Sequence, residues 1–175
     1  SKTRGSPRKN RININEVVRD TLVLLGPIFQ QHRVQVTTAL AESIPCLWGD
    51  DASLQRVLIN LLDNAVDAIK EGGLIKIATQ RCLPSTRTEL GVIVEISDTG
   101  AGIPLELLPN VFDLFVTSKA SGKGTGLGLV VCHEIIKAHK GTIDITSEVG
   151  HGTTVRIFLP TEDKPENQPR AKRMQ

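Results

Sequence analysis

The chain of 175 residues has few cysteines and no long apolar stretch, and both absences exclude classes of protein. Its three cysteines, Cys46, Cys82 and Cys132, are odd in number and follow no metal-binding spacing. They predict free thiols in a reducing compartment and not a disulfide framework. No run of about 18 apolar residues could span a membrane, and no signal peptide opens the chain. We therefore expect a cytoplasmic globular domain.

The common catalytic and phosphate-binding motifs are also missing. The stretch HEIIK (133–137) lacks the second histidine of a zinc protease motif, and no Ser/His/Asp grouping is present. GKG (122–124) continues without the serine or threonine of a P-loop, and no register of the glycines gives GxGxxG. His133, followed by a glutamate, superficially resembles a phosphoacceptor histidine, but its place inside a predicted helix favours a packing role.

The net charge of +2 comes from the ends of the chain. Residues 1–11 hold five basic side chains and no acidic one, whereas residues 12–160 carry a net charge of −4. A folded nucleic-acid-binding surface is therefore not expected, and we expect no nucleic acid among the partners. We predict a basic arm at 1–10, one folded domain at 11–160 and a polar tail at 161–175.

The rest of the chain is organised around residues 98–128. DTGAGIP (98–104) places Asp98 at the end of an apolar run, just before Gly100 and Gly102. Further along, GKGTGLGL (122–129) repeats glycine at every second position and leads into an amphipathic helix. A glycine-rich loop that ends at a helix N-terminus binds anions readily, which predicts a nucleotide pocket covered by a lid. A surface loop without a ligand is the alternative.

Hydrophobic periodicity predicts the order of the elements. We expect strands at 11–15, 33–40, 74–82, 90–97, 142–147 and 153–159, and helices at 15–31, 50–71, 104–108 and 127–139. Asn15 and either Asp50 or Asp51 are the expected N-caps. Pro27 is expected to kink the first helix near its end.

Two asparagines on the predicted helix 50–71 stand out, because asparagine is a poor residue for a helix interior. Asn60 and Asn64 are four residues apart and therefore share one face. Their amide oxygens suit a magnesium ion that also holds phosphates. The alternative interpretation is a solvated helix face.

Asp98 follows a strand in which Val92, Val94 and Ile96 alternate with other residues. The C-terminal end of a strand is a common place for a ligand, and a carboxylate there can accept a hydrogen bond from the amine of adenine. The alternative is an aspartate that only starts a turn. We read Phe112 and Phe115 as core residues that anchor the lid.

Five segments in this order resemble the catalytic ATP-binding domain of bacterial sensor histidine kinases. They are NLLDNAVDA (60–68), DTGAGIP (98–104), VFDLFVTSK (111–119), GKGTGLGL (122–129) and GHGTTVRIFLP (150–160). The superfamily, with its Bergerat fold, also includes gyrase, Hsp90 and MutL ATPases, and the form of the segments is nearest to nitrogen-regulatory and sporulation kinases. The resemblance implies an α/β sandwich in which three helices cover one face of a mixed sheet of about five strands.

The resemblance also implies the cofactors, ATP and Mg²⁺, and the roles of individual residues. Asp98 would bind the adenine amine with Thr153 and water, Asn64 would coordinate magnesium, and Asn60 and Lys119 would lie near the phosphates as catalytic residues. The complete set of implied nucleotide contacts is Asn60, Asn64, Asp67, Asp98, Gly100, Gly102, Ile103, Lys119, Gly124, Thr125, Gly126, Leu127, Gly128, Leu129 and Thr153.

The sequence departs from this family pattern in two respects. Asp67 stands where many members carry a basic residue that contacts phosphate, a task that Lys119 or Lys123 would then take. The helical hairpin with the phosphoacceptor histidine is absent, so we expect a monomeric fragment of a homodimeric kinase. Its partners would be that upstream domain and a response regulator, and the sequence leaves open whether an upstream segment anchors the full-length protein to a membrane.

Position 60 distinguishes a kinase from an ATPase or serine kinase of the same superfamily. Hydrolytic relatives place a glutamate there to take a proton from water, whereas a neutral imidazole needs no such base. Asn60 therefore favours transfer to histidine, although Asp67-Ala68 is shared with the ATPases. The intact glycines, Asn64 and Asp98 argue against a third reading, a degenerate binding module.

Overall fold

The computed structural model describes residues 9–82, 90–113 and 128–161. Within them the elements follow in the order β1 (Asn10–Ile12), α1 (Ile14–Gln31), β2 (Val34–Ala39), β3 (Leu47–Gly49), α2 (Asp51–Ile69), β4 (Gly73–Cys82), β5 (Gly91–Asp98), the 3-10 helix η1 (Leu108–Asn110), α3 (Gly128–Ala138), β6 (Thr142–Glu148) and β7 (Gly152–Pro160).

Five strands form a mixed sheet in the order β2-β4-β5-β7-β6. The edge strand β2 runs parallel to β4, and every other neighbouring pair is antiparallel. The remaining two strands, β1 and β3, pair with each other in a small antiparallel sheet. The predicted mixed sheet of five strands is therefore confirmed.

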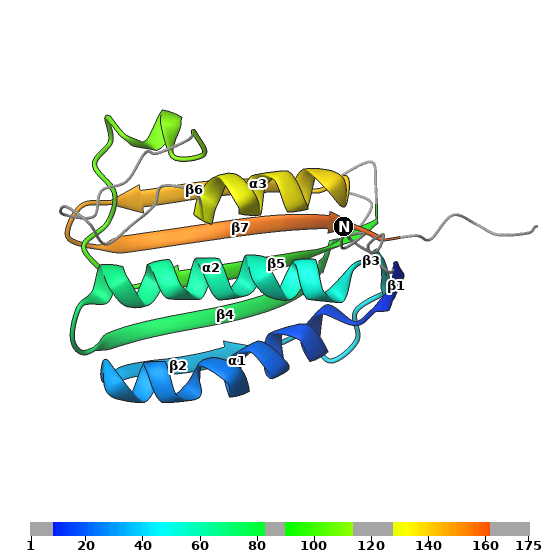
Figure 1. Ribbon diagram of the computed structural model, residues 1–175, viewed down its shortest axis with the longest axis horizontal. Coiled ribbons are helices and arrows are strands. Elements are labelled where there is room, and N and C mark those ends of the chain that lie inside the picture. The colour runs from blue at the N-terminus through cyan, green and yellow to red at the C-terminus, as the bar shows by residue number, and fades with distance from the viewer. Residues whose placement is uncertain (1–8, 83–89, 114–127, 162–175) are drawn as a thin grey trace, which may run out of the picture.

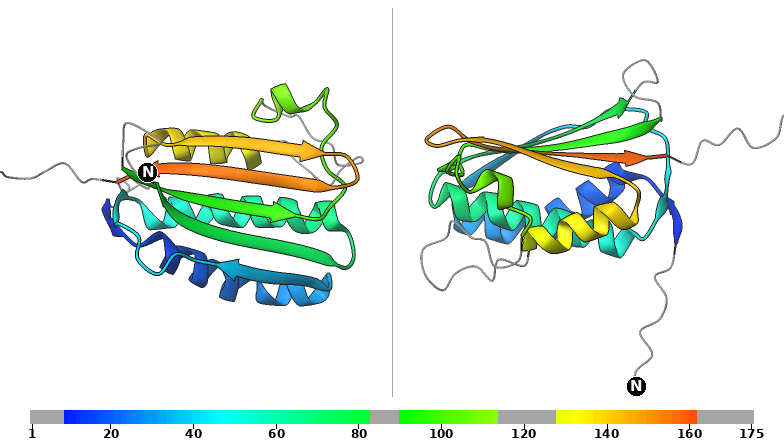
Figure 2. Two further views of the ribbon diagram at one scale, coloured as in Figure 1. Left: turned by 180° about the vertical axis from the view of Figure 1, so that it is seen from behind. Right: turned by 90° about the horizontal axis from the view of Figure 1, so that it is seen from above.

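The three α-helices cover one face of this sheet, with α2 between α1 and α3 (Figure 1). Seen from behind and from above, the described elements leave the opposite face of the sheet without a helix (Figure 2). Strand residues alternate accordingly: Val92, Val94 and Ile96 of β5 join the core under the helices, whereas Ile93 packs on the other face with Cys82 and Phe158. The predicted α/β sandwich is confirmed.

The first helix is capped by Asn13 and not by Asn15, so the predicted cap is wrong. The Asn13 side chain accepts a hydrogen bond from the backbone N–H of Asn15 at 3.0 Å. Asn15 is buried inside the helix, where its side chain donates to the carbonyl of Ala41 at 2.8 Å and accepts from the hydroxyl of Thr79 at 2.7 Å. The polar atoms of its side chain are therefore satisfied by hydrogen bonds to residues distant in sequence, as a buried amide requires.

Other boundaries differ in detail from the expectation. The strand expected at 11–15 is Asn10–Ile12, and the helix expected at 104–108 is a 3-10 turn at Leu108–Asn110. The α2 helix begins after the Asp50 cap, as predicted, but ends at Ile69, because Lys70 adopts a φ of 64°. Pro27 lies inside α1, which continues to Gln31.

Candidate functional site

Three polar side chains occupy core-facing positions in β5, β6 and β7, at one end of the sheet. Asp98 is the last residue of β5 and pairs with Thr153 of β7, which in turn pairs with Ser147 of β6. In each strand the next residue on the same face towards the middle of the sheet is apolar and packs under the helices, as Ile96, Ile145 and Val155 do. The change from apolar to polar side chains on one face marks a candidate site at this end.

Asp98 is a partly buried carboxylate held by backbone groups. Its Oδ1 accepts a hydrogen bond from the N–H of Gly100 at 2.8 Å. Burial raises the pKa of Asp98 above its ordinary value of 3.8, while backbone hydrogen bonds from Gly100 and Thr153 lower it by less. The carboxylate is therefore held in position by backbone N–H groups, and its remaining lone pairs can accept a hydrogen bond from a ligand.

The loop after Asp98 passes between the end of α2 and the turn from β6 to β7. The N–H of Ala101 donates to the carbonyl of Ala68 at 3.0 Å, and its carbonyl accepts from Gly150 at 2.8 Å. A Cβ at Gly100 would lie 2.7 Å from the carbonyl carbon of Ala68, so this approach needs glycine. Gly102 adopts a φ of 77° beside the backbone of Glu148.

Ser147 is a member of the site that the sequence analysis missed. Its Oγ accepts from the N–H of Ile103 at 2.7 Å, donates to the carbonyl of Gly152 at 3.0 Å and lies 2.7 Å from the hydroxyl of Thr153. It joins two residues that the sequence predicts to contact nucleotide, Ile103 and Thr153. The available signal was a serine at the core-facing position after Ile143 and Ile145.

The asparagine pair lies on α2 beside the start of α3. The Nδ2 of Asn60 reaches the carbonyl of Gly128 at 3.5 Å, a long contact for a hydrogen bond. Cys132, fully buried one turn further along α3, points its Sγ at the carbonyl of Val57 at 3.7 Å. Burial raises the pKa of the Cys132 thiol to about 11, while a hydrogen bond with Asn60 lowers it, so this thiol is not a nucleophile at neutral pH.

Asn64 and Asp67 follow on the last turns of α2, Asn64 partly buried and Asp67 exposed. Among the residues that the structure describes, no three histidine, cysteine, aspartate or glutamate side chains gather into a metal site. Magnesium is held by one or two protein oxygens when phosphates and water supply the rest. The amide oxygen of Asn64 is a ligand of the kind that such a magnesium ion takes.

Several predicted site residues fall outside the described part of the chain. They are Lys119, Lys123, Gly124, Thr125, Gly126 and Leu127, together with Phe115. Gly128 and Leu129 form the first turn of α3, and Gly128 is the residue that Asn60 contacts. Phe112 packs against the core, as predicted, with its ring centroid 5.2 Å from that of His133. His133 thus contacts Phe112 from within α3, while 45% of its side chain stays exposed.

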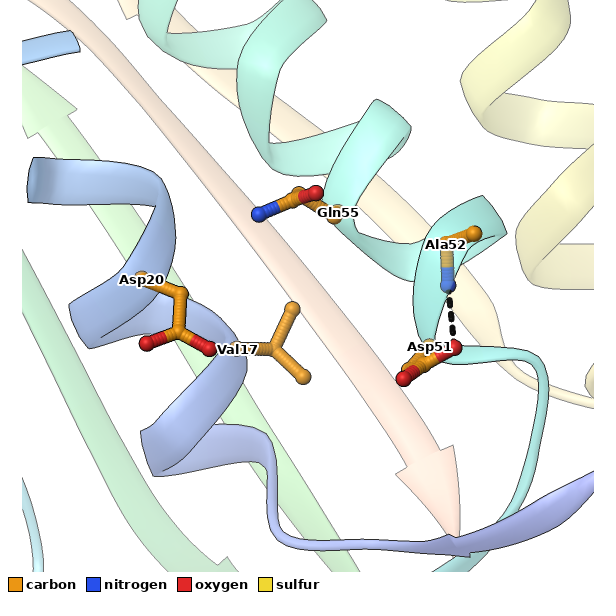
Figure 3. A pocket seen from close by; sticks show the side chains of 5 residues that line it. All are labelled: Val17, Asp20, Asp51, Ala52 and Gln55. Atoms are coloured by element: carbon orange, nitrogen blue, oxygen red, sulfur yellow. Dashed lines mark hydrogen bonds between the residues drawn. The ribbon is translucent and has the colours of Figure 1, made fainter. Parts of the chain in front are cut away.

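A separate hollow lies between α1 and α2, at the opposite end of α2 from Ala68 (Figure 3). Val17 and Asp20 of α1 face Asp51, Ala52 and Gln55 of α2 across it. None of the predicted site residues lines this hollow. Two carboxylates beside an α-helix N-cap do not by themselves make a binding site. The candidate functional site is therefore the group of polar residues at the strand ends.

The fold is an α/β sandwich with a polar site at the strand ends, and comparison with known proteins identifies its family. Residues 49–163 match the family model described as histidine kinase-, DNA gyrase B- and HSP90-like ATPase. The matched part is more than half of the chain, and the chain belongs to this family.

The curated relatives are sensor kinases. The chain is 39% identical over 150 residues to the signal transduction histidine-protein kinase AtoS of Escherichia coli, covering 86% of this chain and 24% of AtoS. It is 38% identical over 165 residues to the adaptive-response sensory kinase SasA of Synechococcus elongatus, covering 90% of this chain and 41% of SasA. The chain thus spans between about a quarter and two fifths of these two relatives.

Solved structures agree with this assignment. The catalytic domain of histidine kinase ThkA, in a nucleotide-free form, superposes with a TM-score of 0.76 at 29% identity and covers 88% of this chain and 96% of that one. ThkA in complex with the response regulator protein TrrA superposes with a TM-score of 0.72 at 26% identity, covering 87% and 42%. Within the described residues, no helix is both long enough and apolar enough to cross a membrane.

The raised pKa of Asp98 predicts a pH-dependent gain in stability for Asp98→Asn. Because the folded state holds the proton more tightly than the unfolded chain, Asp98 lowers the stability of the wild type as pH rises from about 4 towards neutrality. The amide of the variant still accepts from Gly100 but carries no charge. In urea unfolding without nucleotide, the free energy of unfolding of the variant should therefore rise relative to that of the wild type as pH increases through this window. At higher pH the difference between the two should stay constant.

A stability difference between Asp98→Asn and the wild type that stays constant, or moves in favour of the wild type, as pH rises through this window would contradict this prediction. It would mean that the hydrogen bonds from Gly100 and Thr153 to the charged carboxylate offset or outweigh the cost of burying the charge.

Proposed function

We propose that the chain is the ATP-binding catalytic domain of a two-component sensor histidine kinase. It would transfer the γ-phosphoryl group of ATP to a histidine on a separate dimerisation domain. The observation that carries the proposal is the position of Asp98, a partly buried acceptor at the end of β5, fixed by Gly100 and paired with Thr153. Because the chain belongs to this family, we expect this acceptor to bind a nucleotide.

Each part of the site has a role in this proposal. Asp98 accepts a hydrogen bond from the exocyclic amine of adenine, and the loop that contains Gly102 and Ile103 lies beside the base. Asn64 binds the magnesium that accompanies the phosphates, while Asn60 lies near them at the start of α3. The first turn of α3, with Gly128 and Leu129, offers backbone N–H groups and the positive end of the helix dipole to the phosphates.

Transfer to histidine is favoured over hydrolysis because Asn60 cannot act as a base. Water must lose a proton as it attacks phosphorus, whereas a neutral imidazole nitrogen attacks with a free lone pair. The amide nitrogen of Asn60 also points at the carbonyl of Gly128, and its side chain forms a hydrogen bond with Cys132. Both contacts are with protein groups. An ATPase of the same family is the alternative that Asp67-Ala68 suggests.

The partners follow from the same proposal. The phosphoacceptor histidine would belong to a dimerisation domain of the full-length protein, which would act as a homodimer. A response regulator would then take the phosphoryl group, as the complex of ThkA with TrrA suggests by analogy. No nucleic acid takes part.

The Asp98→Asn variant should bind ATP and ADP at least tenfold more weakly than the wild type, which is about 1.4 kcal/mol. The amide that replaces the carboxylate has no negative charge, and its NH₂ group can turn towards the adenine amine without accepting from it. Isothermal titration calorimetry with ADP measures the change. Equal affinity in variant and wild type would refute the assignment of Asp98 to adenine.

The chain should turn over ATP slowly by itself and phosphorylate the histidine-bearing dimerisation domain when that domain is supplied in trans. Positioning of the nucleophile in line with the phosphate is most of the catalysis in phosphoryl transfer. Asn64→Ala should abolish transfer because it removes a magnesium ligand, and the product should be labile in acid and stable in base. Hydrolysis by the chain alone at a rate on the order of 1 per second would favour the ATPase alternative.

A further inference from the structure

Ser147 makes three close contacts with a single hydroxyl group. Its Oγ lies 2.7 Å from the N–H of Ile103, 3.0 Å from the carbonyl oxygen of Gly152 and 2.7 Å from the hydroxyl oxygen of Thr153. The first neighbour can only donate and the second can only accept. The third neighbour is a hydroxyl and can do either.

One arrangement of protons satisfies all three contacts. Ser147 has one proton and two lone pairs. The carbonyl of Gly152 takes that proton, the N–H of Ile103 takes one lone pair, and the other lone pair is left for Thr153. Thr153 must then donate its own proton to Ser147. Its hydroxyl oxygen therefore has only lone pairs left for anything else that approaches it.

We propose that Ser147 determines base selectivity by holding the Thr153 hydroxyl as a pure acceptor; this inference rests on the proposed nucleotide-binding function. Thr153 sits directly across from Asp98 in the β5–β7 ladder, so two acceptors face the base at this end of the sheet. The 6-amino group of adenine has two N–H donors and matches them. The 6-carbonyl oxygen of a hypoxanthine or guanine base is an acceptor and meets no donor there.

The experiment compares ADP with IDP, whose base carries a carbonyl oxygen in place of the 6-amino group of ADP. Binding of each to the 175-residue chain is measured by calorimetry, and the readout is the ratio of the two dissociation constants. Ser147→Ala frees the Thr153 proton, so Thr153 can rotate and donate to the carbonyl oxygen. The preference for ADP should fall about fivefold, the value of one typical hydrogen bond. Ser147→Thr keeps a hydroxyl and should keep the preference.

A matched control is available one rung away in the same strands. Ser97 of β5 and Thr154 of β7 form a second hydroxyl pair, 2.9 Å apart, at positions that alternate with Asp98 and Thr153 and so lie on the other face of the sheet. Ser97→Ala should leave the preference for ADP unchanged. If Ser97→Ala lowers it as much as Ser147→Ala does, the effect is general to the strand ends and the inference is wrong.

The ratio separates selectivity from a purely structural role of Ser147. A loosened Ile103 loop would weaken ADP and IDP equally, and an unchanged ratio in Ser147→Ala would overturn the inference. The Thr153→Val variant has no hydroxyl to orient. Adding Ser147→Ala to it should therefore give the same ratio of dissociation constants as Thr153→Val alone. A further fall in that background would also contradict the inference. Absence of ADP binding to the wild type would refute the proposed function itself.

Discussion

The candidate site depends on the close approach of three backbone segments at Ala101. Its N–H bonds to the carbonyl of Ala68 at the end of α2, and its carbonyl bonds to the N–H of Gly150 in the turn before β7. One residue thus connects the layer of helices to the turn between β6 and β7. Glycines at 100 and 102 permit the approach, because a side chain at either position would meet neighbouring backbone. The loop that follows Asp98 is thereby fixed before any ligand arrives.

A sheet covered on one face places chemistry at the ends of its strands. The core side of β5, β6 and β7 is apolar for most of its length and becomes polar only at Asp98, Ser147 and Thr153. Polar groups at the margin of a core keep partial access to solvent while their hydrogen bonds are fixed, which is what recognition of a base edge requires. The hollow between α1 and α2 differs, because its carboxylates lie on helix surfaces and not at the margin of the core.

Local sequence patterns predict those parts of the molecule whose causes are local. The alternation of Val92, Val94 and Ile96 indicates a strand, and the glycines after it indicate a tight turn, so the position of Asp98 follows. The roles of Asn15 and Ser147 depend on partners distant in sequence or on strand register. Asn15 bonds to Ala41 and Thr79, which no capping rule anticipates. The strand β3 has only three residues, too few for a period of two to be recognised in the sequence, and it exists because it pairs with β1.

Backbone amide chemical shifts, recorded by NMR during a titration with a non-hydrolysable ATP analogue and Mg²⁺, test the central claim most directly. If the nucleotide binds at the strand ends, saturable shifts should appear at Gly100, Ile103 and Thr153, while Ala52 and Gln55 beside the α1–α2 hollow stay unchanged. Shifts confined to Ala52 and Gln55, with Gly100 and Thr153 unaffected, would contradict the account.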